Sequence, residues 1–313
     1  MKKFLLSKST VFSIIFGTVL GGIILLSFFL LRRPLKQMPS PSELAQQYEK
    51  NLPAAEIFIA STSALSATSA ATTVQGPKVQ LPLSSAELEK SFGPCVDVPT
   101  LMYHHIQDLQ VAKAAHQEKL TVGTNFFSEH MDYLRDHHYS VIAMQDLVDF
   151  FDHGKALPPK PILLTFDDGY ADFATDAWPL LQSHGFKATM FLPTGLLEKS
   201  GYLQWSTIAD IEKENLVLMA NHTYSHHTMR SSLSIITTEI TLSEKDLKAH
   251  HLDEPQIFAY PYGENSDQSE QFLKQQDYKL GFTTKHGRYL CKGQRIILPR
   301  IRVGNAPLSM YGL

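Results

Sequence analysis

The stretch ILLTFDDGYADF, residues 162–173, places two adjacent aspartates, Asp167 and Asp168, directly after an apolar run. The apolar run predicts a buried strand. Like charges this close raise each other's cost of ionisation, and a strand end offers little water, so the pair needs a cation or a proton. Asp-Gly is also common turn chemistry, so this stretch alone fits a plain turn equally well.

Short apolar runs alternate with amphipathic stretches after residue 96. Strands are predicted at residues 98–104, 161–168, 187–193, 216–222, 256–263, 278–284 and 295–303. Helices are predicted between several of them, at residues 126–137, 144–151, 171–184 and 243–251. This alternation predicts a parallel α/β fold, either closed as a barrel or open as a sheet.

Unusual polar residues follow these apolar runs. They are His104 and His105, the two aspartates, His222 and Tyr262. In a barrel and in an open sheet alike, the chemistry collects at the carboxyl ends of the strands. We therefore expect these side chains to share one face of the domain.

The segment NHTYSHH, residues 221–227, is the strongest companion to the aspartates. His222 and His226 are four residues apart, so both imidazoles can converge on one ion, with an aspartate from another strand as third ligand. Two histidines and one carboxylate leave a position open for water, as in catalytic zinc sites. His227 is an alternative to His226, and solvated surface histidines are an alternative to the whole motif.

The first 33 residues differ from the rest of the chain. Residues 11–31 form an uncharged run, long enough to cross the ~30 Å hydrocarbon core of a bilayer as a helix, which leads directly into Arg32 and Arg33. We predict an uncleaved membrane anchor over residues 1–33. Basic residues flank the run on both sides and leave its orientation open.

Composition separates a linker from a folded domain. Residues 34–94 are rich in Ser, Thr, Ala, Pro and Gln, which predicts a flexible linker before a domain at residues 95–313. The chain of 313 residues has 43% hydrophobic content and a net charge of −3, so it can bury a core and has no basic excess for nucleic acid. Cys95 and Cys291 predict either a disulfide across the domain ends or two separate buried thiols.

The motifs TFDDGY and HTYSH together resemble the polysaccharide deacetylase family, the NodB-type domain of carbohydrate esterase family four. The resemblance spans residues 98–303. LMYHHI, FAYPYGE and LPRIRV are similar to the subgroup that de-N-acetylates exopolysaccharides such as poly-β-1,6-N-acetylglucosamine. The resemblance implies a distorted (β/α) barrel, a divalent metal, usually zinc, and a polysaccharide substrate. A polymer outside the cell favours a catalytic domain in the periplasm or at the cell surface, whereas a lipid-linked substrate on the inner leaflet would reverse this orientation.

The resemblance also assigns roles to single residues. Asp167 would be the general base, and Asp168 would bind the metal with His222 and His226. The backbone N–H of Tyr262 would stabilise the oxyanion. Gly169 would allow the tight turn that lets both carboxylates face one pocket.

Two positions depart from the family pattern. Many members carry an arginine before the Pro-Tyr pair, where this chain has Ala259 in FAYPYG. Arg300 in LPRIRV is the candidate to supply that guanidinium, with a structural ion pair as the alternative. The usual Leu-x-His near the C-terminus is also missing, which makes His104 in LMYHHI the candidate general acid, ahead of His105 and His286.

The predicted function is removal of N-acetyl groups from a poly-β-1,6-N-acetylglucosamine-like exopolysaccharide. The alternatives are a peptidoglycan or chitooligosaccharide N-deacetylase and a noncatalytic carbohydrate-binding protein. Trp205 in YLQWST is predicted either to stack on a sugar ring or to lie in the core. Histidines in polar or helical surroundings, His130 among them, are expected to face solvent.

Overall fold

The computed structural model describes residues 84–252 and 254–313. The predicted anchor at residues 1–33 and most of the predicted linker lie outside this range. Within it, no helix combines the length and the apolar character needed to cross a membrane.

Parallel strands form a closed ring at the centre of the described chain. The sheet has eight strands, and the additional pairing of β2 with β6 closes seven of them into a ring that leaves β5 outside. The ring follows chain order: β2 (Thr100–Tyr103), β6 (Pro161–Phe166), β7 (Ala188–Leu192), β8 (Val217–Asn221), β9 (Ile257–Ala259), β10 (Leu280–His286) and β12 (Leu298–Arg302).

Closure depends on β2, whose two edges pair with the second and the last strand of the ring. Its register runs from Thr100 opposite Leu163 in β6 and includes Leu101 opposite Ile301 in β12. The ring is irregular, because β8 and β9 share a single residue pair and the register between β10 and β12 shifts. The predicted barrel is confirmed and the open sheet is excluded.

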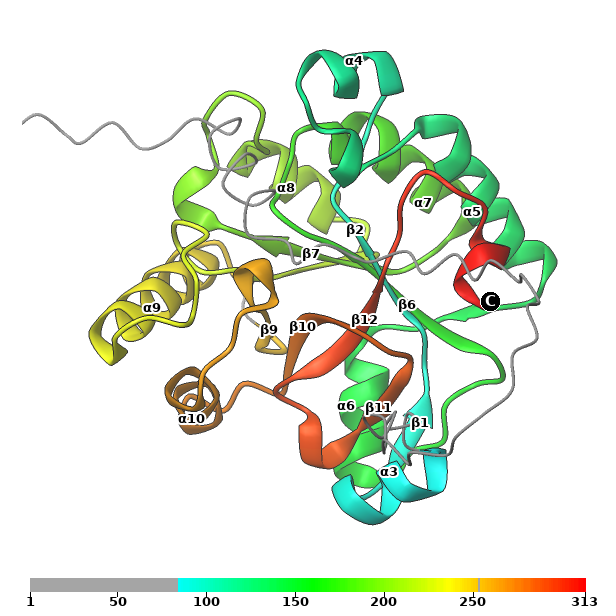
Figure 1. The fold of residues 1–313 in the computed structure, drawn as a ribbon. Coiled ribbons are helices and arrows are strands. Elements are labelled where there is room, and N and C mark those ends of the chain that lie inside the picture. The colour runs from blue at the N-terminus through cyan, green and yellow to red at the C-terminus, as the bar shows by residue number, and fades with distance from the viewer. Residues whose placement is uncertain (1–83, 253) are drawn as a thin grey trace, which may run out of the picture. The chain divides into compact units, whose positions relative to one another are not determined.

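Helices surround the ring, as Figure 1 shows. They are α5 (Thr124–Asp136), α6 (Met144–His153), α7 (Trp178–His184), α8 (Trp205–Glu212), α9 (Leu233–Ala249) and α10 (Asp267–Gln275). Each buries one apolar stripe; in α5 the stripe is Phe127, Met131 and Leu134, at the spacing of one helix face.

Shorter elements complete the domain. They are α3 (Ser85–Phe92), β1 (Cys95–Asp97), β3 (His105–Ile106), α4 (Leu109–Ala114), β4 (Thr121–Val122), β5 (Ser140–Val141) and β11 (Tyr289–Cys291). The linker was predicted to extend to residue 94, but residues 85–92 form the helix α3, so this predicted end is wrong. Ser84 caps this helix in a capping box with Glu87, which is a local sequence signal for a helix start, but the helix buries no residue fully.

The two cysteines form a disulfide. Cys95 and Cys291 face each other where β1 pairs antiparallel with β11, and their sulfur atoms are 2.00 Å apart. This decides between the two predicted alternatives. The bond joins positions 196 residues apart and ties the start of the domain to β11.

The largest error in the predicted helices concerns α9, which begins at Leu233 rather than at residue 243. Its first half contains Thr237, Thr238 and Thr241, whose β-branched side chains lower helix propensity. Burial of Ile236 and Ile240 nevertheless holds this half against the barrel. Tertiary packing therefore outweighs local propensity here.

Candidate active site and metal centre

Five polar residues singled out from the sequence lie in four strands of the ring or directly follow them. Asp167 and Asp168 follow β6, His222 follows β8 and His104 follows β2, while Arg300 lies within β12. All five side chains are buried. The strands therefore bring charged groups into the interior, where each needs a partner.

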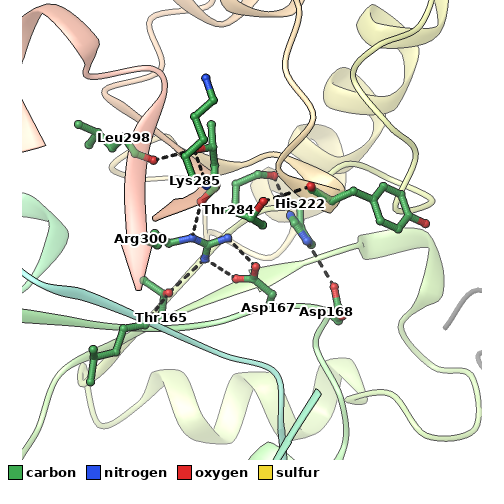
Figure 2. Close-up of polar contacts among 12 residues, drawn as sticks. Thr165, Asp167, Asp168, His222, Thr284, Lys285, Leu298 and Arg300 are labelled. Atoms are coloured by element: carbon green, nitrogen blue, oxygen red, sulfur yellow. Dashed lines mark hydrogen bonds and ion pairs between the residues drawn. The ribbon is translucent and has the colours of Figure 1, made fainter. Parts of the chain in front are cut away.

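Three of these groups converge. The ligand atoms of Asp168, His222 and His226 all lie within 4.8 Å of one another. The Nε2 atoms of His222 and His226 are 3.4 and 3.1 Å from Oδ1 of Asp168 (Figure 2 shows the contact with His222). His227 lies apart, with its Nε2 atom 3.1 Å from the Ser231 hydroxyl. The structure thus selects His226 over His227 for this group.

The chemistry of the three residues fits a divalent cation. Oδ1 of Asp168 is buried and makes no hydrogen bond, so it has an unused acceptor. His222 donates from Nδ1 to the Ala259 carbonyl at 2.7 Å, which leaves the Nε2 lone pair directed at Asp168. Burial raises the pKa of Asp168, but His226 and His222 outweigh burial and hold it well below its usual value.

The turn after β6 lets the two carboxylates diverge. Asp168 has φ of 76° and Gly169 has φ of 66°, both in the left-handed region. A Cβ atom on Gly169 would lie 3.0 Å from a Leu192 methyl group, so both backbone angle and space favour glycine. Asp168 has no such freedom, and its conformation needs support from its surroundings.

Asp167 faces Arg300, in a geometry that Figure 2 displays. The guanidinium donates to both carboxylate oxygens at 2.7 Å, and it also donates to the Thr165 hydroxyl and the Thr283 carbonyl. Arg300 is fully buried. Burial raises the pKa of Asp167, but the charge and hydrogen bonds of Arg300 outweigh burial and lower it. Both adjacent aspartates therefore ionise, each against its own partner.

Of the three histidines considered as general acid, His104 is the one near the aspartates. Burial lowers the pKa of His104 to about 4, although Asp168 and Asp167 act in the opposite direction. His105 is turned away: its Nδ1 is 2.5 Å from Asp172 and its ring stacks on Tyr170. His286 is exposed at the end of β10.

Tyr262 lies beside the metal group, in the short turn Pro261–Gly263 that follows β9. Its ring meets the His226 imidazole edge-on, with 4.6 Å between centroids, and its φ is 61°. A Cβ atom on Gly263 would lie 2.0 Å from the Thr284 hydroxyl. Only glycine therefore fits where this turn approaches β10. The left-handed conformation of Tyr262 is a strained feature next to the candidate site.

Trp205 and His130 each contact partners distant in sequence. Trp205 is half-buried and stacks on His250 with 3.9 Å between ring centroids, so one face of the indole is already covered. His130 was expected to face solvent, which is wrong. It is 1% exposed on the apolar face of α5, where its ring nitrogens contact the Tyr103 hydroxyl and the Ala306 carbonyl. These partners, distant in sequence, make the burial possible.

Sequence reasoning missed the residues that hold the site together. Thr165 and Thr283 orient Arg300 from within strands, where threonine is ordinary. The Thr228 hydroxyl donates to Glu264 at 2.5 Å and joins the histidine segment to the Tyr262 turn. No spacing in the sequence marks such pairs, because they depend on the arrangement of whole strands and turns.

Comparison with known proteins gives one consistent result. Residues 154–281 match the family model described as polysaccharide deacetylase. A poly-beta-1,6-N-acetyl-D-glucosamine N-deacetylase of Escherichia coli K12 is 24% identical over 252 residues, which cover 66% of this chain and 36% of that protein. The enzyme of the same name from Staphylococcus epidermidis is 23% identical over 193 residues, covering 57% of this chain and 66% of that protein.

Solved structures agree with the fold. The Streptococcus pyogenes deacetylase PplD, in complex with acetate, superposes with a TM-score of 0.62 and 27% identity, covering 67% of this chain and 93% of that one. The described chain thus spans nearly all of a solved deacetylase but about a third of the Escherichia coli relative, of which it covers 36%.

Proposed function

We propose, from the premise that residues 154–281 form a domain of the polysaccharide deacetylase family, that this protein is a metal-dependent hydrolase acting on a polysaccharide. It would remove the N-acetyl groups from N-acetylglucosamine units. The observation that carries the proposal is the division of two adjacent buried aspartates between an arginine and a histidine pair.

The two carboxylates suit two different tasks. Asp168, His222 and His226 would hold the cation, with zinc as the proposed metal because two imidazoles and one carboxylate are a catalytic zinc set. When bound, such an ion makes water more acidic and polarises a carbonyl oxygen.

Asp167 is the proposed general base. Arg300 holds its carboxylate in one orientation through two hydrogen bonds of 2.7 Å and keeps it ionised, so an oxygen can take a proton from the attacking water. Arg300 occupies the role for which the family commonly uses an arginine elsewhere in the chain. In this account it is a positioning residue, because it acts through Asp167.

The departing amine and the oxyanion need further groups. The backbone N–H of Tyr262 is proposed to stabilise the oxyanion, since its turn lies against His226. His104 is proposed to give a proton to the departing amine. Because burial lowers the pKa of His104 to about 4, its imidazole is neutral before the reaction. The proton that Asp167 takes from the attacking water would therefore pass to His104 and from there to the departing nitrogen as its bond to the acetyl carbon breaks.

The proposed substrate is a poly-β-1,6-N-acetylglucosamine-like exopolysaccharide. The motifs LMYHHI and LPRIRV and the names of the two relatives support this polymer. Peptidoglycan and chitooligosaccharides have the same acetamide group and are the alternative substrates. A sugar-stacking role for Trp205 would use the indole face opposite His250.

We also propose that residues 1–33 anchor the chain in a membrane and that the catalytic domain lies outside the cytoplasm. The disulfide between Cys95 and Cys291 supports this location, because disulfides persist in oxidising compartments. An uncleaved anchor would keep the full-length chain in the membrane fraction after alkaline washing. A mature chain that starts after Leu31 would contradict it.

Acetate release from a panel of polymers tests the function. The full-length protein in detergent, loaded with zinc, is incubated with poly-β-1,6-N-acetylglucosamine, chitin oligomers and peptidoglycan, with Asp167→Asn as the matched control. We expect the fastest release from the first polymer and little release by the variant. Binding of the polymers without acetate release from any of them would instead favour a noncatalytic carbohydrate-binding protein.

A further inference from the structure

The segment that carries the metal-site histidines is tied to α9 by one carboxylate. Ser225, the residue before His226, donates from its backbone N–H to Oε2 of Glu239 and from its hydroxyl to Oε1, both at 2.7 Å. Glu239 is half-buried near the middle of α9. Both carboxylate oxygens thus engage the same residue, and that residue adjoins a candidate ligand.

The histidine segment needs such a tie, because its backbone is strained. Thr223 has φ of 66° and His226 has φ of 59°, in the left-handed region that residues other than glycine rarely adopt. Residues 222–230 contain neither helix nor strand that could impose these angles. Strained backbone persists where the surrounding contacts define it fully.

The two histidines are fixed in different ways. His222 is oriented through its own ring, whose Nδ1 donates to the Ala259 carbonyl. His226 is held through the backbone one residue earlier, by way of Ser225 and Glu239. Residues behind the ligands commonly set metal affinity by fixing ligand orientation.

We propose that Glu239 is a positioning residue that fixes His226 for metal binding by holding Ser225; this rests on the metal site of the proposed function. The carboxylate holds the segment in place before a metal arrives, so less order has to be gained on binding. Removing it releases the strained backbone and leaves His226 free to turn away from Asp168.

Glu244 provides a matched control on the same helix. Its Oε1 atom accepts a hydrogen bond of 2.8 Å from the side-chain amide of Gln256, so it too joins another segment to α9. Gln256 directly precedes β9 and lies outside the histidine segment. Loss of Glu244 therefore removes a carboxylate from α9 without removing a hydrogen bond to the histidine segment.

Zinc affinity of the full-length protein, stripped of metal and titrated against a competing chelator, tests the proposal. Glu239→Ala should weaken zinc binding by about 10- to 100-fold, whereas Glu244→Ala should bind zinc as the parent does. Glu239→Gln should recover part of the affinity, because its amide oxygen can still accept from the Ser225 N–H.

Parent-like affinity in Glu239→Ala would overturn the proposal, and so would an equal loss in Glu244→Ala. If Glu239→Ala does not fold, Ser225→Ala takes its place. That change removes the hydroxyl donor and keeps the N–H, so we expect a smaller loss of affinity, and unchanged affinity would contradict the proposal. A parent that binds no zinc would overturn the metal site of the proposed function itself, which is a separate outcome.

Discussion

The two halves of the site are built differently. The base half consists of Asp167 and Arg300. The Arg300 guanidinium also contacts Thr165 and Thr283, so this half is anchored in barrel strands. The metal half depends on Asp168 and on His226, both with left-handed φ angles, in segments that follow the strands. The proposed base is thus fixed by the barrel itself, whereas the proposed ligand His226 depends on a contact from α9, outside the ring.

Breaking the metal half should have the largest effect. His222→Ala removes a ligand that is 1% exposed and oriented by the Ala259 carbonyl. We expect loss of bound zinc and a fall in acetate release on the order of 10³-fold, because metal catalysis contributes several kcal/mol. Metal content by elemental analysis and acetate assays measure both effects. Full zinc content in the variant would remove His222 from the ligand set.

Breaking the base half should act on stability as well as rate. Arg300→Met leaves the Asp167 carboxylate buried without its cation, and we expect the free energy of unfolding at pH 7 to fall by about 3–5 kcal/mol. Zinc should still bind, because the hydrogen bonds of Arg300 go to Thr165, Asp167 and Thr283. Denaturant unfolding and zinc titration measure the two effects; an unchanged free energy of unfolding would contradict the role of the pair.

The Asp167–Arg300 pair should contribute to stability in a pH-dependent way, and the sign follows from the lowered pKa of Asp167 in the folded protein. The stability that the pair contributes is present above the ordinary aspartate pKa and is lost as pH falls through the lower folded value. In Arg300→Met this acid loss of stability should shrink.

The disulfide lies apart from both halves, so its removal should lower the stability of the domain and leave its activity unchanged. Cys95→Ser with Cys291→Ser should lower the free energy of unfolding by about 2–4 kcal/mol, because the bond closes a loop across most of the domain. Acetate release per folded molecule should stay the same, since β1 precedes β2 and approaches the barrel from the amino ends of the strands. A matching loss of rate at low temperature would contradict this separation.

His104 tests the connection between the halves, because it interacts electrostatically with both aspartates. His104→Gln should keep its zinc and lose acetate release by on the order of 10²-fold, as expected for removal of a general acid. His105→Gln is the matched control, since His105 pairs with Asp172 instead. A greater rate loss in His105→Gln, with zinc still bound, would transfer the acid role to that residue.

Local patterns predicted the barrel strands and the two motifs that the structure brings together. Each of the seven predicted strands overlaps a strand of the ring, because apolar runs bounded by polar residues are a local signal. Asp168, His222 and His226 could be selected because carboxyl ends of parallel strands meet at one face.

The features that could not be predicted depend on partners distant in sequence. α9 starts early because Ile236 and Ile240 are buried by the rest of the fold, against the preference of its threonines. His130 is buried because Tyr103 and Ala306 supply hydrogen bonds from remote positions. The same holds for Glu239, which lies 14 residues from Ser225 in a helix whose first half the sequence did not reveal.

The most direct test compares the two adjacent aspartates in one experiment, by measuring zinc affinity and acetate release for Asp167→Asn and Asp168→Asn. We predict that Asp167→Asn binds zinc nearly as the parent does and loses at least about 10²-fold in rate, as for a general base. Asp168→Asn should lose both zinc and rate, because its carboxylate is a ligand. Equal loss of zinc in the two variants would contradict the division of roles between them.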